Sequence, residues 1–148
     1  MIKNITNLGD AAIYCDFGDE VNRDTNSKVI NFFKNIKKNK IDGIINLAPS
    51  YNKLIISYDL SVVNFETIRD KIENLEIEDL LNNKVNKLEI PVCFEEEFNL
   101  DINRLEKKTN KSFKQFLKEF LAKEYFCYMT GFIAGMPFLG DLNKDLRI

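Results

Sequence analysis

The sequence predicts an α+β fold that begins with a ferredoxin-like βαββαβ domain over residues 1–85. Two observations predict it. Apolar residues alternate or cluster along four short segments, which is typical of strands, and they recur at helical spacing along two others. The order of these segments up to residue 94 is strand, helix, strand, strand, helix, strand. The 148 residues, 45% of them hydrophobic, are enough for one domain, or for one small domain and part of another.

The pattern starts with a strand over 11–17, in which Ile13, Cys15 and Phe17 alternate with more polar neighbours. A helix follows, with an apolar stripe and with lysines on its polar side and at its C-terminal end, where the helix dipole favours cations. We interpret these lysines as a solvated helix end. The stripe consists of Val29, Ile30, Phe33 and Ile36, and the lysines are Lys34, Lys37, Lys38 and Lys40.

Two strands are predicted next, over 41–47 and 53–58, and the Pro and Asn residues of 48–52 suit the turn of a hairpin. A second amphipathic helix is predicted behind a cap at Asn64, from Phe65, Ile68, Ile72 and Leu75.

The last strand of the pattern is predicted over 88–94, where Leu88, Ile90, Val92 and Phe94 alternate. Pro91 restricts this strand to the edge of a sheet or to a bulge, because proline has no N–H to donate.

Polar residues 82–87 form the predicted boundary between two domains, 1–85 and 86–148. Beyond it we expect a short helix over 101–109, a second helix that starts with a capping box of Ser112 and Gln115, and a short strand over 126–129. One face of the second helix is apolar, which is more typical of a core than of a cofactor site. That face consists of Phe113, Phe116, Leu117, Phe120 and Leu121.

Composition argues against several functional classes. The chain has no histidine, which removes Ser-His and Cys-His nucleophile pairs and histidine metal ligands. A net charge of -2 lacks the basic excess that nucleic-acid binding rewards. Three widely spaced cysteines do not suggest disulfides or a zinc site. No secretory signal is evident, and the longest uncharged stretch is shorter than the ~20 residues that a membrane span needs. We therefore expect a cytoplasmic protein that binds neither nucleic acid nor membrane.

Three groups of residues could carry chemistry, but each has a plainer interpretation. Glu95–Glu97 could gather a hard cation, yet adjacent side chains on an extended segment point to opposite faces, so a solvated acidic turn is favoured and no metal site is predicted. Asp10 and Asp19 lie beside glycines, as is ordinary in turns, and are interpreted as structural. Cys127 lies in an apolar strand without a base, so we expect it to be buried and inert.

The most specific segment is the uncharged stretch 125–140, which holds three of the six glycines and one of the three prolines. Its glycines permit positive φ and close backbone approach. Two interpretations remain open: an apolar hairpin buried by its own domain, or a loop that lines a pocket or docks on a partner. The candidate loop residues are Gly131, Phe132, Gly135, Pro137, Phe138, Leu139 and Gly140. No catalytic residue can be assigned.

Residues 131–142 read Gly-Phe-x-x-Gly-x-Pro-Phe-Leu-Gly-x-Leu, which resembles the signature of the family that contains the B subunit of 5-oxoprolinase. That family of carboxyltransferase-domain subunits also includes the allophanate hydrolase subunit 1 type domain of urea carboxylase and the sporulation kinase inhibitor KipI. The sequence differs from the usual family pattern at Ala134, Met136 and Asp141. Further matches are Leu8-Gly9-Asp10-Ala11, Phe17-Gly18-Asp19, Ile90-Pro91-Val92-Cys93-Phe94 with Phe98, and the tyrosines Tyr125 and Tyr128.

The resemblance implies that residues 86–148 are the N-terminal portion of a cyclophilin-like β-barrel domain, lacking most of the barrel. It implies the B subunit of an ATP-dependent 5-oxoprolinase, which converts 5-oxoproline to glutamate together with subunits C and A. The complex would use ATP, and this chain alone would neither bind ATP nor catalyse. The alternatives are a protein-binding regulator that acts on a histidine kinase, as KipI does, or a subunit related to allophanate hydrolase and urea carboxylase. We expect residues 86–148 to expose apolar surface and to need a partner.

Overall fold

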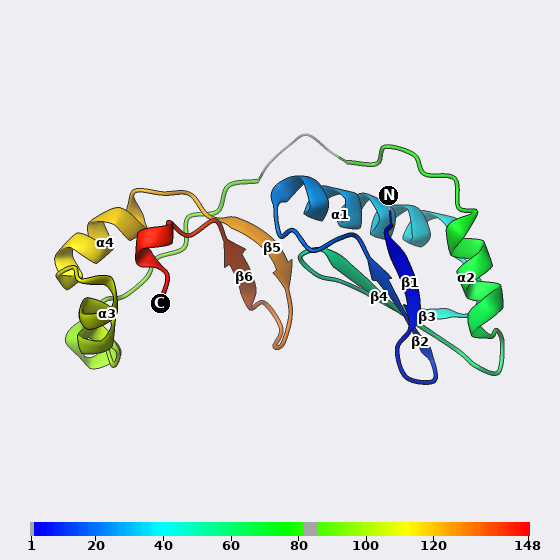
Figure 1. The fold of residues 1–148 in the computed structure, drawn as a ribbon, viewed down its shortest axis with the longest axis horizontal. Helices are drawn as coiled ribbons and strands as arrows, with labels where there is room; N and C mark the ends of the chain where they lie inside the picture. The colour runs from blue at the N-terminus through cyan, green and yellow to red at the C-terminus, as the bar shows by residue number, and fades with distance from the viewer. Residues whose placement is uncertain (1, 82–85) are drawn as a thin grey trace. The chain divides into compact units, whose positions relative to one another are not determined.

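The computed structural model describes residues 2–81 and 86–148 and has a mixed α/β fold with antiparallel sheets (Figure 1). Its contacts divide the chain into two units. The first comprises Met1–Asn83 with Tyr128–Pro137, and the second comprises Lys84–Cys127 with Phe138–Ile148. Residues 82–85 of the expected boundary lie outside the described residues, and the assignment of residues 1–85 and 86–148 as separate domains stays a prediction.

The first unit is built on a four-stranded sheet in the order β1-β2-β4-β3, with all neighbours antiparallel. The strands predicted over 11–17, 41–47 and 53–58 are confirmed. β1 was not predicted, because a four-residue strand with a single apolar side chain has no readable alternation. The strands are β1 Asn4–Asn7, β2 Ala12–Asp16, β3 Ile44–Pro49 and β4 Lys53–Tyr58.

Both predicted helices of this unit are confirmed, as α1 Arg23–Asn39 and α2 Phe65–Glu73. Each begins at an asparagine whose side chain accepts a backbone N–H: Asn22 Oδ1 from Thr25 at 2.8 Å, and Asn64 Oδ1 from Thr67 at 2.9 Å. The apolar stripes of both helices join one core with one face of β2 and β4. That core consists of Ile13, Cys15, Phe17, Val29, Phe32, Ile36, Leu54, Ile56, Tyr58, Ile68 and Ile72.

The strand predicted over 88–94 is wrong, because residues 86–95 have no regular secondary structure. A segment with alternating apolar residues forms a strand only where it can pair with the free edge of a sheet. β2 has β1 on one side and β4 on the other, so the unpredicted β1 takes the place that a fourth strand could have filled. Pro91 further weakens pairing, because it lacks an N–H.

The second unit contains two short helices, α3 Ile102–Thr109 and α4 Phe113–Leu121, both as expected. The capping box at the start of α4 is confirmed, since Ser112 N donates to Gln115 Oε1 at 3.0 Å and Ser112 Oγ accepts from Gln115 N. No residue of α3 or α4 is buried in the described structure. None of the described helices combines the length and apolar character needed to cross a bilayer.

Candidate functional site

The uncharged stretch forms a β-hairpin in which the candidate loop residues lie together. β5 Phe126–Thr130 confirms the strand predicted over 126–129, and it pairs with β6 Pro137–Gly140. Residues 131–136 connect the two strands and are closed by a hydrogen bond from Gly131 N to the Met136 carbonyl at 3.1 Å. All seven candidate residues therefore lie in the connecting loop and in β6.

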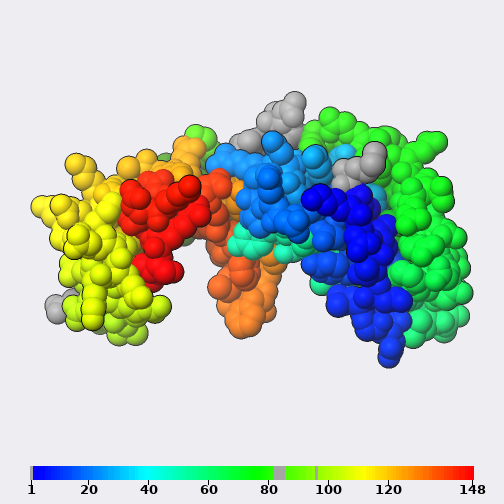
Figure 2. Space-filling view, viewed as in Figure 1, coloured from blue at the N-terminus to red at the C-terminus, as the bar shows by residue number. Residues whose placement is uncertain are grey.

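The tip of this hairpin is apolar and exposed. Phe132 is 91% exposed, and Ile133 is 62% exposed. Figure 2 shows the orange residues of the hairpin as a projecting lobe. The interpretation of the tip as buried core is therefore wrong, because the backbone turns its side chains outward. An apolar tip of this kind suits contact with another molecule.

Two positions of the loop have left-handed backbone, and they explain why its sequence is specific. Gly135 has φ of +80°, which glycine adopts without cost. Phe132 has φ of +66°, which costs a bulky residue on the order of 1 kcal/mol. Backbone strain at an exposed aromatic residue makes Phe132 a candidate contact residue.

The base of the hairpin is held by Asn26 on α1. The Asn26 amide is 2% exposed and donates to the carbonyls of Ser50 at 3.1 Å, Tyr51 at 3.0 Å and Tyr128 at 3.2 Å. The rings of Tyr51 and Tyr128 contact each other with centroids 5.1 Å apart. Ser50 Oγ lies 3.4 Å from the Met129 sulfur. One buried amide thus joins the first turn of α1, the β3–β4 turn and β5.

Asn26 was missed in the sequence, although a signal was present. It continues the apolar stripe of α1, three residues before Val29 and seven before Phe33. A polar residue on an apolar stripe is buried with it and must find hydrogen-bond partners there.

A second polar cluster shapes the turn after β2. Asp16 Oδ1 accepts from Gly18 N at 2.7 Å and from Lys53 Nζ, and Lys53 also donates to the Gly18 carbonyl at 2.8 Å. The hydrogen bond from Lys53, helped by that from Gly18, lowers the pKa of the Asp16 carboxyl, and the bond to Asp16 raises the pKa of Lys53. Asn52 Nδ2 donates to the same Gly18 carbonyl at 2.7 Å. These groups satisfy one another's hydrogen-bonding capacity, so we assign the cluster a structural role.

The carboxylates considered in the sequence lie on the surface. Asp10 and Asp19 are exposed, and Asp19 lies 3.9 Å from Lys3 Nζ. Glu95 and Glu97 are exposed as well, while the side chain of Glu96 lies outside the described residues. Within the described residues, no three acidic or cysteine side chains gather as metal ligands would.

The expectation of a buried Cys127 is wrong, because its side chain is exposed. The alternation of β5 places Tyr128, rather than Cys127, on its buried side. Cys15 in β2 is the buried cysteine of the sheet, and burial raises its pKa to about 12.

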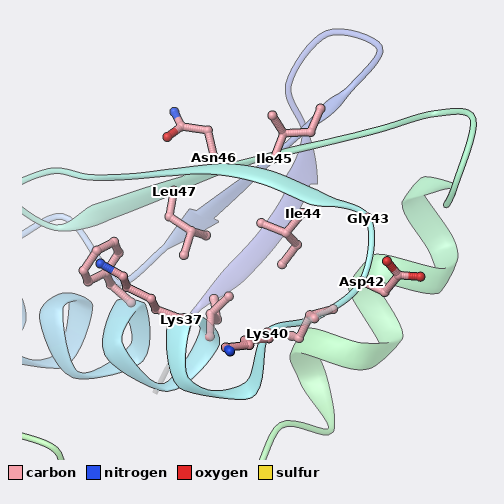
Figure 3. A pocket seen from close by; sticks show the side chains of 11 residues that line it. Lys37, Lys40, Asp42, Gly43, Ile44, Ile45, Asn46 and Leu47 are labelled. Atoms are coloured by element: carbon pink, nitrogen blue, oxygen red, sulfur yellow. The ribbon is translucent and has the colours of Figure 1, made fainter.

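A groove of about 520 Å³ lies between the C-terminal end of α1 and β3 (Figure 3). Leu47 and Ile44 point into it, and Lys37 and Lys40 lie on the side of α1. Lys37 Nζ is 5.9 Å from the ring centroid of Phe33, so this lysine already covers apolar surface. The predicted solvated helix end is confirmed for Lys37, Lys38 and Lys40, which are exposed, whereas Lys34 is half-buried and donates to the Leu80 carbonyl at 3.2 Å.

Fold and site together define a mixed α/β protein that presents a strained, uncharged apolar loop. Residues 3–148 match the family model described as "Carboxyltransferase domain, subdomain C and D". Over 154 aligned residues the chain is 31% identical to the B subunit of 5-oxoprolinase from Bacillus subtilis (strain 168), covering 96% of this chain and 64% of that protein. The chain therefore belongs to the family of carboxyltransferase-domain subdomains C and D, as its resemblance to the 5-oxoprolinase family predicted.

Solved structures share the fold at low identity. A crystal structure of TTHA0988 superposes with a TM-score of 0.74 at 22% identity, over 93% of this chain and 27% of that chain. The structure of the K. lactis urea amidolyase matches with a TM-score of 0.61 at 7% identity, over 86% of this chain and 9% of that chain. The chain thus spans about two thirds or less of the length of each of these relatives.

Proposed function

We propose that this chain works as the B subunit of a cytoplasmic, ATP-dependent 5-oxoprolinase complex that converts 5-oxoproline to glutamate, and that it acts only with subunits C and A. The identity to the B. subtilis protein over nearly the whole chain carries this proposal. In the reaction, the lactam carbonyl oxygen attacks the γ-phosphorus of ATP, and ADP leaves. A first water adds to the activated carbon, and the C–N bond breaks as the ring nitrogen takes up a proton, which leaves an acyl phosphate. A second water hydrolyses this acyl phosphate to glutamate and phosphate.

In this proposal the chain has a ferredoxin-like first domain and contributes the start of a cyclophilin-like barrel. Its loop of Gly131, Phe132, Gly135, Pro137, Phe138, Leu139 and Gly140 forms a substrate- or subunit-facing wall. Two observations support that role. The tip is apolar and exposed, and no charged side chain occurs between Tyr125 and Gly140, so the loop can exclude water but cannot transfer protons. The proton carriers would come from other parts of the complex.

The test is reconstitution of this chain with subunits C and A, with glutamate formed from 5-oxoproline as the readout. Phe132→Asp places a charge at the loop tip, and we expect it to lower turnover at least ~10-fold. Ile45→Asp is the matched control, because Ile45 is 69% exposed on β3 and lies outside the loop. Absence of turnover in every combination of subunits would exclude the proposal. Replacing 5-oxoproline by allophanate, with released ammonia as the readout, tests the relationship to allophanate hydrolase and urea carboxylase.

The exposed apolar tip also favours a second candidate, a protein-binding regulator of a histidine kinase, because such binding requires apolar contact and no catalytic group. The readout is kinase autophosphorylation with and without the chain. Inhibition that Phe132→Asp abolishes and Ile45→Asp preserves would support a regulator. An unchanged rate at saturating chain would exclude it.

A further inference from the structure

β3 is an edge strand whose outer side is open to pairing. In the sheet order β1-β2-β4-β3, β3 has β4 as its neighbour on one side only. Ser50 N donates to the Lys53 carbonyl at 2.8 Å, so the backbone of Ser50 faces β4. Because the backbone groups of successive residues point to alternate sides of a strand, the N–H and C=O of Leu47 point away from β4. Leu47 can therefore form both hydrogen bonds of an antiparallel pair with an added strand.

The groove of about 520 Å³ between α1 and β3 lies on the face of β3 that carries the Leu47 side chain (Figure 3). Leu47 and Ile44 point into it, whereas the side chain of Ile45 points to the other side of β3. Phe33 and Ile36 of α1 add apolar lining. A residue that pairs with Leu47 places its side chain on the same face of the sheet. That side chain therefore enters apolar surroundings and should be aliphatic.

Two features keep the open edge short. The pairing of β3 with β4 shifts between Ile44 and Asn46, and the strand ends at Pro49, which has no N–H to donate. Bulges and prolines of this kind disfavour the pairing of one sheet edge with another. The edge is thus suited to a short extended segment rather than to a long strand or a second sheet.

The helix side of the groove is positively charged. Lys37 and Lys40 lie there and are exposed, while the carboxylate of Asp42 is directed away from the groove (Figure 3). A second copy paired through the same edge would bring its own two lysines to these, and the repulsion of like charges disfavours that arrangement. An acidic segment would instead meet opposite charge.

α1 holds an acidic segment of the chain itself in a similar way. Lys38 Nζ lies 2.6 Å from Glu78 Oε1, and Lys34 Nζ donates to the Leu80 carbonyl at 3.2 Å. Asn35 Nδ2 donates to the Glu78 carbonyl at 2.9 Å, and Asn35 Oδ1 accepts from the Glu78 N–H at 3.0 Å. This segment has no regular secondary structure, so lysines and backbone hydrogen bonds together hold it on the helix. The groove offers the same two kinds of contact.

We propose that the groove and the open edge of β3 bind a short extended segment of another protein. In that segment an aliphatic residue has a glutamate or aspartate two residues before it and two residues after it. The aliphatic residue pairs with the backbone of Leu47 and places its side chain in the groove, and the carboxylates reach Lys37 and Lys40. The inference does not depend on the reaction proposed above, because none of these residues belongs to the loop of the hairpin.

The test is fluorescence anisotropy of a fluorescein-labelled probe peptide, Thr-Glu-Thr-Val-Thr-Glu-Thr-amide, titrated with the full chain. We expect saturable binding whose affinity falls at least ~5-fold between about 0.05 M and about 0.5 M salt, because salt screens exposed charges. The control peptide has lysine in place of both glutamates. It should bind at least ~10-fold more weakly, because its charges repel those of the groove.

Methylation of the probe separates strand pairing from charge attraction alone. A methyl group on the valine nitrogen removes the donor to the Leu47 carbonyl, and we expect it to weaken binding at least ~10-fold. A methyl group on the nitrogen of an adjacent threonine lies on the opposite edge of the peptide, and it should change the affinity less than ~2-fold. Equal effects of the two methyl groups would contradict strand pairing.

Variants of the chain test the charged side of the groove. Lys37→Gln combined with Lys40→Gln should weaken binding of the probe about 10-fold. Lys28→Gln combined with Lys71→Gln is the matched control, because both lysines are exposed, lie outside the groove and change the net charge equally. Since all four positions are exposed, the fold should be preserved, which circular dichroism verifies.

Three further results would overturn the inference. They are no saturable binding of the probe, equal affinity for the glutamate and lysine peptides, and a dimer in light scattering that the probe does not dissociate, which would make a second copy the occupant. Since the readout is peptide binding rather than turnover, a reconstituted complex that forms no glutamate would reject the proposed function and leave this inference intact.

Discussion

The helices of the first unit and those of the second are equally patterned but differ in what they bury. In α1, Val29, Phe32 and Ile36 are at most 6% exposed, because the sheet lies against them. In α4, Phe116 and Phe120 stack on each other with centroids 6.0 Å apart, and Leu121 is 61% exposed. An apolar stripe therefore determines that a helix forms, while burial requires a second layer. The sheet provides that layer for α1 and α2, whereas the described residues bury no residue of α4.

The largest expected effect compares one fully buried residue of the first unit with one half-buried residue of the second. Ile56 in β4 is fully buried, so Ile56→Ala should cost about 2–4 kcal/mol through lost burial and a cavity. Leu117 in α4 is half-buried, and Leu117→Ala should cost less than about 1 kcal/mol in the chain alone. Urea unfolding followed by circular dichroism measures both. Equal costs would show that α4 packs into a core as firm as that of the sheet, and the comparison would fail.

The next effect tests how the loop is joined to the well-packed unit. Asn26→Ala removes the buried Nδ2 donor that three carbonyls share, and it should destabilise the chain by about 1–3 kcal/mol. Hydrogen exchange of the amides of residues 128–131 should rise in parallel, because the base of the hairpin loses its attachment. Asn46→Ala, at an exposed position of β3, is the control. Unchanged exchange in the hairpin of the Asn26→Ala variant would show that the Tyr51–Tyr128 contact holds the loop by itself.

Sequence patterns predicted the helices of both units and the strands that have a clear apolar alternation. They identified α1, α2, α3, α4, β2, β3, β4, β5 and the capping box of α4. They failed where the outcome depends on a neighbour: β1 is too short and polar to be recognised, and it fills the edge beside β2. The loop was recognisable from its glycines and its lack of charge, but its exposure and its attachment through Asn26 follow from tertiary contacts that no local pattern encodes.

A smaller effect concerns the polar cluster behind β2 and its pH dependence. Because the pKa of Asp16 is lowered in the folded state, its contribution is present above the unfolded value of about 4 and is lost as pH falls through the folded value. The pKa of Lys53 is raised in the folded state, so the stability that this ion pair contributes persists up to about pH 10. That stability is lost only as the pH rises through the folded pKa of Lys53.

Asp16→Asn should therefore cost about 0.5–1 kcal/mol at pH 7, and the difference from the unmodified chain should shrink below about pH 4. Urea midpoints measured at pH 7, 5 and 3 check this. A difference that stays constant across these pH values would assign the effect of Asp16 to packing rather than to its charge.

The smallest expected effect on stability has the opposite sign and lies at the loop tip. Phe132 has φ of +66° and is 91% exposed, so Phe132→Gly relieves backbone strain while removing almost no burial. The greater freedom of glycine in the unfolded chain offsets part of this relief, which leaves a gain of about 0.5 kcal/mol or less. Glutamate formation by the reconstituted complex should nevertheless fall, because the aromatic side chain is gone.

Gly135→Ala is the matched change at the other left-handed position of the loop. It introduces strain at φ of +80° without removing an aromatic side chain, and a Cβ at this position would meet nothing within 4 Å. It should cost about 1 kcal/mol of stability. If Phe132→Gly lowers both stability and turnover, Phe132 packs within the chain, and its strain serves folding. If the stability of the Phe132→Gly variant is unchanged while its turnover falls, the strained conformation serves contact with a partner. The loop would then differ from the sheet core, where each buried side chain stabilises the fold.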